Sequence, residues 1–160
     1  MKLIFLGTGP TEPVRRPERR SERTNSSIIF VDDKREEAIL FDCTPNFTEQ
    51  MHREKLNPEI IRYVFLSHGH MDAVGGLPQL FRANKDFTVY CSNETKNRVL
   101  EEFKSLKSVR FENIEHGEEV DIHLGGDAHV RVIPFDVTHA EAFPTGEKFP
   151  TLGFRIELKG

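Results

Sequence analysis

Two histidines and an aspartate alternate with other residues in the segment LSHGHMDAVGG, at positions 66–76. On extended backbone, side chains two positions apart point to the same side, so His68 and His70 face one region and Asp72 can reach a neighbouring position. Two imidazoles placed in this way can share a metal ion at about 2.0–2.1 Å from each nitrogen. A bare His-x-His pair is more often an ordinary hydrogen-bonded loop. The apolar stretch before it, the aspartate, and the Gly-Gly-Leu-Pro that follows favour a metal site.

The elements that must position these residues follow from the hydrophobic pattern. Strands are expected at 1–6, 26–32, 37–42, 60–67, 87–91, 109–114, 118–124, 128–137 and 151–158, and helices at 44–56, 74–84 and 93–106. Thr44 is a candidate N-cap with Pro45 at the first helical position. This order predicts the α/β class, with helices flanking a mixed, mostly antiparallel sheet.

Length and composition limit the number of domains and the classes of partner. The 160 residues, 37% hydrophobic and 30% charged, predict one domain over residues 1–160. A net charge of −4 excludes a global field that attracts nucleic acid or an anionic membrane. No apolar run approaches the ~20 residues needed to cross a bilayer, and the opening MKLIFLGTGP is unlike a signal peptide. We therefore expect a cytoplasmic protein without a membrane partner, in which Cys43 and Cys91 are reduced thiols.

A long polar segment, residues 8–26, has no periodicity and is expected to be a loop. It carries five arginines, Arg15, Arg16, Arg19, Arg20 and Arg23. Such a run is usually a solvated surface. The alternative is an arm that contacts substrate, because guanidinium groups pair well with phosphate.

Five segments together resemble the metallo-β-lactamase superfamily, specifically its branch of ribonuclease Z-like proteins and phosphonate-pathway cyclic phosphodiesterases. They are FLGTGP, ILFDCTPNF, LSHGHMDAVGGLP, VIPFDVTHA and TLGFRIEL. The family motif is His-x-His-x-Asp-His. The resemblance implies an αββα-type sandwich, of which this chain would form the N-terminal half.

The same resemblance implies a set of ligands. His68 and His70 would bind a first metal ion together with His139, and Asp72 would bind a second. Asp42 would support these ligands from behind. Zinc is the first choice for one or two ions, and manganese, iron and nickel remain alternatives.

Two departures from the family pattern bear on activity. Ala73 occupies the position of the last histidine of the motif, and neither histidine nor aspartate occurs after His139. A sheet cut at this point would expose an apolar face and an unpaired edge. We expect a fragment of a longer chain, with a half-fold that dimerises or a domain that has become smaller as alternatives. A second copy or a complementary half chain would then cover the exposed face.

The functional hypothesis is a metal-dependent hydrolase that cleaves phosphodiester bonds through a metal-activated water. Asp72 is the candidate catalytic residue, because it could act as a base or orient the water if only one ion binds. The substrate would be a small phosphodiester or a nucleotide or RNA-like molecule, and this chain alone could be inactive. The alternative is a non-catalytic metal-binding or interaction module that has lost the second metal site.

Overall fold

The computed structural model describes residues 1–9, 24–32, 34, 36–125, 129–140 and 148–159, and at positions 139 and 140 it describes the backbone alone. Its strands form a six-stranded sheet in the order β1-β2-β3-β4-β5-β6 and a three-stranded sheet in the order β7-β8-β9. The first sheet consists of β1 (Lys2–Gly7), β2 (Ser27–Val31), β3 (Ala38–Phe41), β4 (Ile61–Phe65), β5 (Thr88–Cys91) and β6 (Arg110–Asn113). The second consists of β7 (Val120–His123), β8 (His129–Ala140) and β9 (Lys148–Lys159).

The strands of the large sheet change direction once along its width. β1, β2 and β3 pair antiparallel, whereas β3, β4, β5 and β6 pair parallel. The predicted α/β class and mixed sheet are therefore confirmed, with the antiparallel pairs confined to one side of this sheet and to the small sheet. Because β3 and β4 are parallel, the segments that follow them leave the same edge of the sheet.

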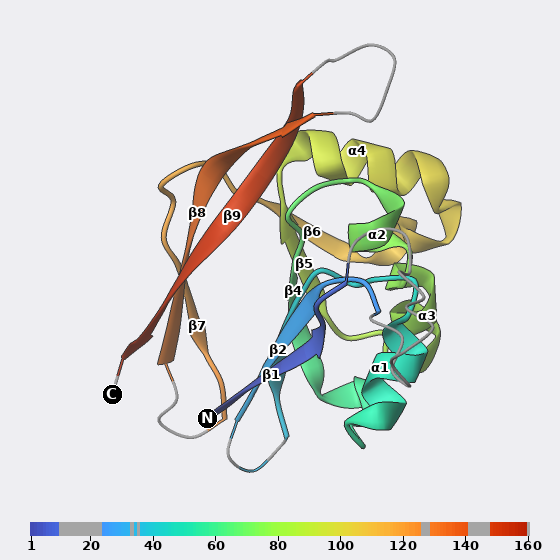
Figure 1. The fold of residues 1–160 in the computed structure, drawn as a ribbon, viewed down its shortest axis with the longest axis vertical. Helices are drawn as coiled ribbons and strands as arrows, with labels where there is room; N and C mark the ends of the chain where they lie inside the picture. The colour runs from blue at the N-terminus through green and yellow to red at the C-terminus, as the bar shows by residue number, and fades with distance from the viewer. Residues whose placement is uncertain (10–23, 33, 35, 126–128, 141–147, 160) are drawn as a thin grey trace, which may run out of the picture.

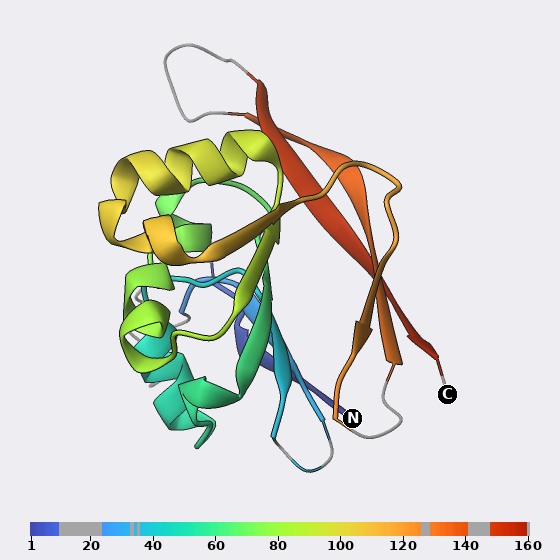
Figure 2. The ribbon, with the colours of Figure 1, turned by 180° about the vertical axis from the view of Figure 1, so that it is seen from behind.

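Four α-helices cover one face of the large sheet, and the small sheet covers the other (Figures 1 and 2). They are α1 (Phe47–Arg53), α2 (Met71–Val74), α3 (Leu77–Ala83) and α4 (Asn93–Glu102), with 3-10 turns at Pro58–Ile60 and Lys104–Ser108. One hydrophobic cluster fills the space between sheet and helices, and it includes Leu40, Val64 and Leu77. A second cluster lies between the two sheets, where Phe41 stacks on Phe65.

The helices differ in detail from the sequence prediction. Thr44 does not cap α1, because Asn46 occupies the N-cap position and the Thr44 hydroxyl donates to the side-chain oxygen of Gln50 instead. Pro45 therefore lies before the helix. Of the helix expected over 74–84, residues Leu77–Ala83 form α3, and a separate short helix, α2, ends at Val74, before Gly75 and Gly76.

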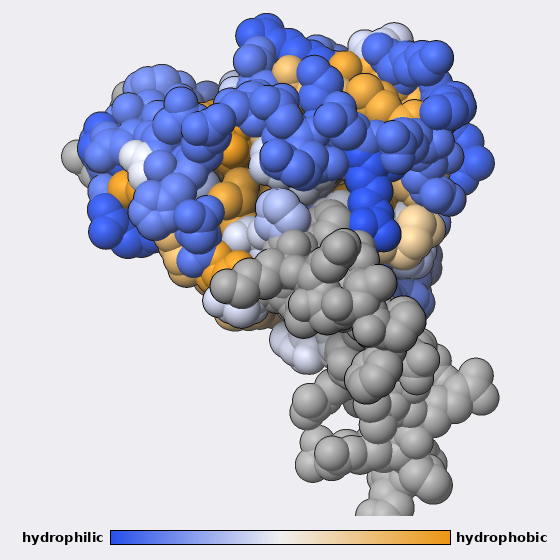
Figure 3. Space-filling view, turned by 90° about the horizontal axis from the view of Figure 1, so that it is seen from above, coloured by the Kyte–Doolittle hydropathy of each residue, from blue (hydrophilic) through white to orange (hydrophobic). Residues whose placement is uncertain are grey.

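The cysteines, the length of the helices and the surface can be compared with the sequence predictions. Cys43 and Cys91 are free and buried, as predicted. None of the described helices is long and apolar enough to cross a membrane. Seen from above, the described surface is largely hydrophilic at its rim, with hydrophobic residues showing between (Figure 3). The arginines at positions 15, 16, 19, 20 and 23 lie outside the described residues.

Candidate metal centre

The metal motif occupies the loop that joins β4 to α2. The backbone of Leu66 donates to Tyr90 of β5, which holds the start of this loop at the edge of the sheet. From the small sheet, the N–H of Leu152 in β9 donates to the carbonyl of Ser67 at 2.8 Å. The loop is thus fixed between both sheets before the first histidine.

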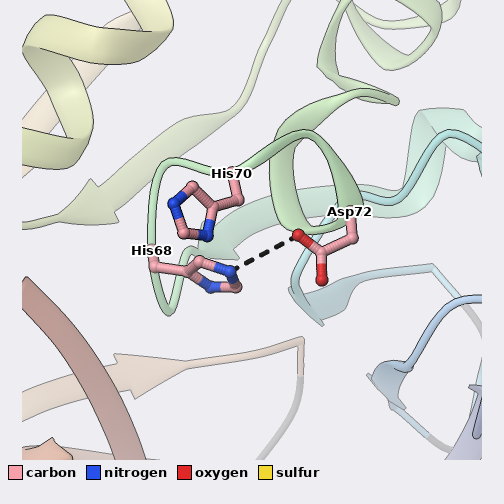
Figure 4. A group of neighbouring side chains, drawn as sticks. All are labelled: His68, His70 and Asp72. Atoms are coloured by element: carbon pink, nitrogen blue, oxygen red, sulfur yellow. Dashed lines mark ion pairs between the residues drawn. The ribbon is translucent and has the colours of Figure 1, made fainter. Parts of the chain in front are cut away.

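His68, His70 and Asp72 converge on one point of this loop (Figure 4). One ligand atom from each lies within 4.8 Å of the other two, and His68 Nε2 lies 3.4 Å from Asp72 Oδ1. The two imidazole rings are nearly perpendicular, with centroids 4.9 Å apart. Tetrahedral coordination with bonds of about 2.0–2.1 Å separates its donor atoms by roughly 3.4 Å. The distance between His68 Nε2 and Asp72 Oδ1 has this value, and two nitrogen donors with one carboxylate are a ligand set that suits a zinc-type ion.

A helical turn places Asp72 at this point, whereas the spacing implied extended backbone. The chain stops being extended at His70, whose carbonyl accepts from the N–H groups of Ala73 and Val74 as α2 begins. Asp72 therefore lies four residues from His68 across the first turn of a helix. The alternation of side chains that holds for extended backbone therefore ends before Asp72.

Asp42 is linked to His68 by hydrogen bonds that both residues make with Ser67. Asp42 Oδ1 accepts the Ser67 N–H at 2.8 Å, and Asp42 Oδ2 lies 2.8 Å from the Ser67 hydroxyl oxygen. The same hydroxyl oxygen is 2.8 Å from Nδ1 of His68. If ionised Asp42 accepts the hydroxyl proton, the Ser67 oxygen accepts Nδ1–H of His68. The lone pair on Nε2 is then free to bind a metal ion at the point where His68, His70 and Asp72 converge.

The environment of Asp42 also affects its charge. The pKa of this carboxyl is raised from 3.8 to about 7, mainly by burial and to a smaller extent by the charge of Asp72, while the two hydrogen bonds from Ser67 act in the opposite direction. Its backbone has φ of 58°, a region that aspartate and asparagine occupy more readily than most residues. A nearby cation would favour the ionised form.

Close packing also fixes the segments before and after α2. A Cβ on Gly76 would lie 2.1 Å from the carbonyl oxygen of Thr44 and 2.7 Å from Cβ of Phe47. A Cβ on Gly69, between the two histidines, would lie 3.2 Å from Cβ and Cδ of Arg98. The stem of Arg98, an exposed residue of α4, therefore packs against the metal loop.

The structure places the other predicted residues less completely. His139 is the penultimate residue of β8 and pairs with Phe149 of β9, and its side chain lies outside the described part. Ala73 is buried in the cluster between sheet and helices. Its methyl group provides no ligand atom.

Sequence reasoning did not identify Ser67 or Arg98. Ser67 directly precedes His68, and a hydroxyl beside a candidate ligand is a signal that could have been used. Arg98 has no such signal, because only the packing of α4 against the loop brings it near Gly69.

Comparisons with known proteins identify relatives of this chain. Residues 37–160 match the family described as the beta-lactamase superfamily domain. A ribonuclease Z of Methanococcus maripaludis is 28% identical over 160 residues, which cover 96% of this chain and 47% of that protein. The chain thus spans about half the length of the curated relatives it matches.

Solved structures show the same fold. Zinc-bound PqqB from Methylobacterium extorquens aligns with a TM-score of 0.75 at 22% identity, covering 99% of this chain and 62% of the other. A diphosphatase from the PhnP family aligns with a TM-score of 0.72 at 24% identity, covering 96% of this chain and 61% of the other.

Proposed function

The chain belongs to the metallo-β-lactamase superfamily, and from this premise we propose that it acts as a metal-dependent hydrolase of phosphodiester bonds. The observation that carries the proposal is the convergence of His68, His70 and Asp72. Relatives named ribonuclease Z, and the fold shared with a diphosphatase, support a phosphate ester as substrate.

His68, His70 and Asp72 would hold the ion, with zinc as first choice and His139 as the further histidine ligand. The donor set fits, since the 3.4 Å between His68 Nε2 and Asp72 Oδ1 is the separation expected for neighbouring ligands of one ion. A bound ion supplies Lewis acidity, which lowers the pKa of water toward about 7 and offsets charge on the attacked phosphate.

The residues of the chain have separate tasks in this proposal. Through Ser67, Asp42 keeps the proton of His68 on Nδ1, so that Nε2 remains a ligand. Asp72, when not used as a ligand, orients the attacking water or accepts its proton. Arg98, whose stem packs on Gly69 between the two histidines, would provide positive charge for an anionic substrate. The five arginines between positions 15 and 23 would add to this charge.

Ala73 supports a second candidate, a metal-binding module without catalysis. A second ion at this site would have Asp72 as its main protein ligand, because the alanine has no donor atom. Such a module would retain the first ion and the fold, and its contacts with another molecule would constitute its function.

The decisive experiment combines metal analysis, oligomeric state and activity on one preparation. The purified chain is loaded with zinc or manganese, passed over a sizing column with light scattering, and assayed with bis-p-nitrophenyl phosphate. Hydrolysis that disappears in His70→Ala but persists in His52→Ala, a change of an exposed histidine in α1, supports the hydrolase. Bound metal without hydrolysis, whether the species is a monomer or an oligomer, favours the module.

A further inference from the structure

Two carboxylates outside the metal centre lie at the opposite ends of the strands of the large sheet. Asp32 and Glu37 flank the connection between β2 and β3, next to the residue at which β3 begins. The metal loop and Asp42 instead follow the ends of the parallel strands β3 and β4. These two acidic residues therefore belong to neither the metal centre nor its supporting hydrogen bonds.

One oxygen of Asp32 has no hydrogen-bond partner. Oδ1 accepts from the backbone N–H groups of Glu36 at 2.7 Å and Glu37 at 3.3 Å, and so closes the hairpin. Oδ2 is buried without a partner, in a residue that is 2% exposed. A buried carboxylate oxygen without a hydrogen bond is costly, which makes this atom an unexplained feature of the described structure.

A second carboxylate lies near the unpartnered oxygen, beside the space that a side chain on Gly125 would occupy. A Cβ built on Gly125 would lie 3.6 Å from Asp32 Oδ2 and 3.7 Å from Glu37 Oε2. Glu37 Oε2 also accepts the N–H of Gly125 at 2.7 Å. Gly125 follows β7, so the two carboxylates of the large sheet meet the small sheet at a position without a side chain.

We propose that this space binds a hard divalent cation, Ca²⁺ or Mg²⁺, between Asp32 Oδ2 and Glu37. Carboxylate oxygens are the preferred ligands of both ions, and water and backbone carbonyls complete their coordination. The cation compensates the buried charge of Asp32 and offsets repulsion between the two carboxylates. It also links the β2–β3 connection to the segment after β7, and so fixes the small sheet, which carries His139, against the large one.

The test measures thermal unfolding of the full chain with and without Ca²⁺ or Mg²⁺. Saturating cation should raise the Tm of the wild type by roughly 5–10 °C. Asp32→Asn removes the charge of the unpartnered group and should abolish the rise. Gly125→Ala keeps both carboxylates, but its methyl group fills the space at ordinary contact distances, so it should also abolish the rise.

Glu36→Gln is the matched control, since it removes one charge from an exposed side chain of the same hairpin and should leave the rise intact. Calorimetric titration of the same four proteins measures binding directly, including in a variant of low stability. No rise and no heat of binding in the wild type overturns the proposal. A response unchanged in Asp32→Asn or in Gly125→Ala overturns it equally, because the ion then binds elsewhere.

Discussion

Asp42 and His68 are connected through a single hydroxyl group, since the oxygen of Ser67 lies 2.8 Å from Asp42 Oδ2 and 2.8 Å from His68 Nδ1. The three residues come from the ends of two parallel neighbouring strands, β3 and β4. With Asp42 ionised, this pairing of strands places the proton of His68 on Nδ1 and leaves Nε2 able to bind a metal ion.

Asp42→Asn should weaken metal binding roughly 10- to 100-fold, the usual effect of removing a group that orients a histidine ligand. Asparagine tolerates the φ of 58° found here, so the backbone is retained. Competition with a chelator of known affinity measures the change. Asp86→Asn, which removes an exposed partner of Arg62, serves as control, and equal affinities for the two variants would contradict the role of Asp42.

Stability of the metal-free protein should decrease as pH rises from about 4 to about 7. Asp42 has a pKa of about 7 when folded, raised by burial, against 3.8 as the ordinary value. Between these values the folded state binds more protons than the unfolded state, so the free energy of unfolding falls with pH, by up to about 4 kcal/mol. Denaturant unfolding at each pH in chelator gives the curve. Asp42→Asn should flatten it, and parallel curves for both proteins would refute this assignment.

Local patterns predicted most of the elements, but neither the division into two sheets nor which strands pair in parallel. Alternating and continuous apolar runs located the strands, because side-chain periodicity is a local property. The separation into two sheets and the parallel order from β3 to β6 depend on contacts between distant segments, which no local pattern contains. Thr44 was a reasonable N-cap by residue type, yet Gln50 supplies it with a buried acceptor and α1 starts later.

In the candidate site too, local patterns predicted some residues, and contacts between distant segments determine the others. Spacing and residue type identified His68, His70 and Asp72, and the structure brings them together. Asp72 was assigned by an extended alternation, although a helical turn places it, because the change in backbone at His70 has no clear sequence signal. Ser67 and Arg98 act through packing and hydrogen bonds across elements, which sequence spacing does not predict.

Replacement of either motif histidine by alanine should remove most of the bound metal from a protein that otherwise holds about one ion per chain. His68 and His70 supply the two nitrogen donors of the described cluster, so each variant leaves a single imidazole. Elemental analysis after gel filtration measures the loss. His52→Ala should retain full metal content, and a His70→Ala protein that does the same would place the ion elsewhere.

Gly76→Ala should lower the free energy of unfolding by about 3 kcal/mol. The added methyl group would approach the carbonyl oxygen of Thr44 to 2.1 Å, so the segment between α2 and α3 must shift. Backbone conformation is not the cause, since Gly76 has φ of −89°. Gly125→Ala makes ordinary contacts and serves as control in chelator. Equal stability of the two variants would show that the segment is not tightly packed.

Arg98→Met tests whether positive charge beside the histidines contributes to substrate binding. Methionine keeps an unbranched stem against Gly69 and removes the guanidinium. The KM for bis-p-nitrophenyl phosphate should rise roughly 3- to 10-fold, with kcat and metal content little changed. Arg62→Met changes a half-buried residue near the opposite end of β4 and is the matched control. A fall in metal content instead of a rise in KM would mean that Arg98 supports the loop and not the substrate.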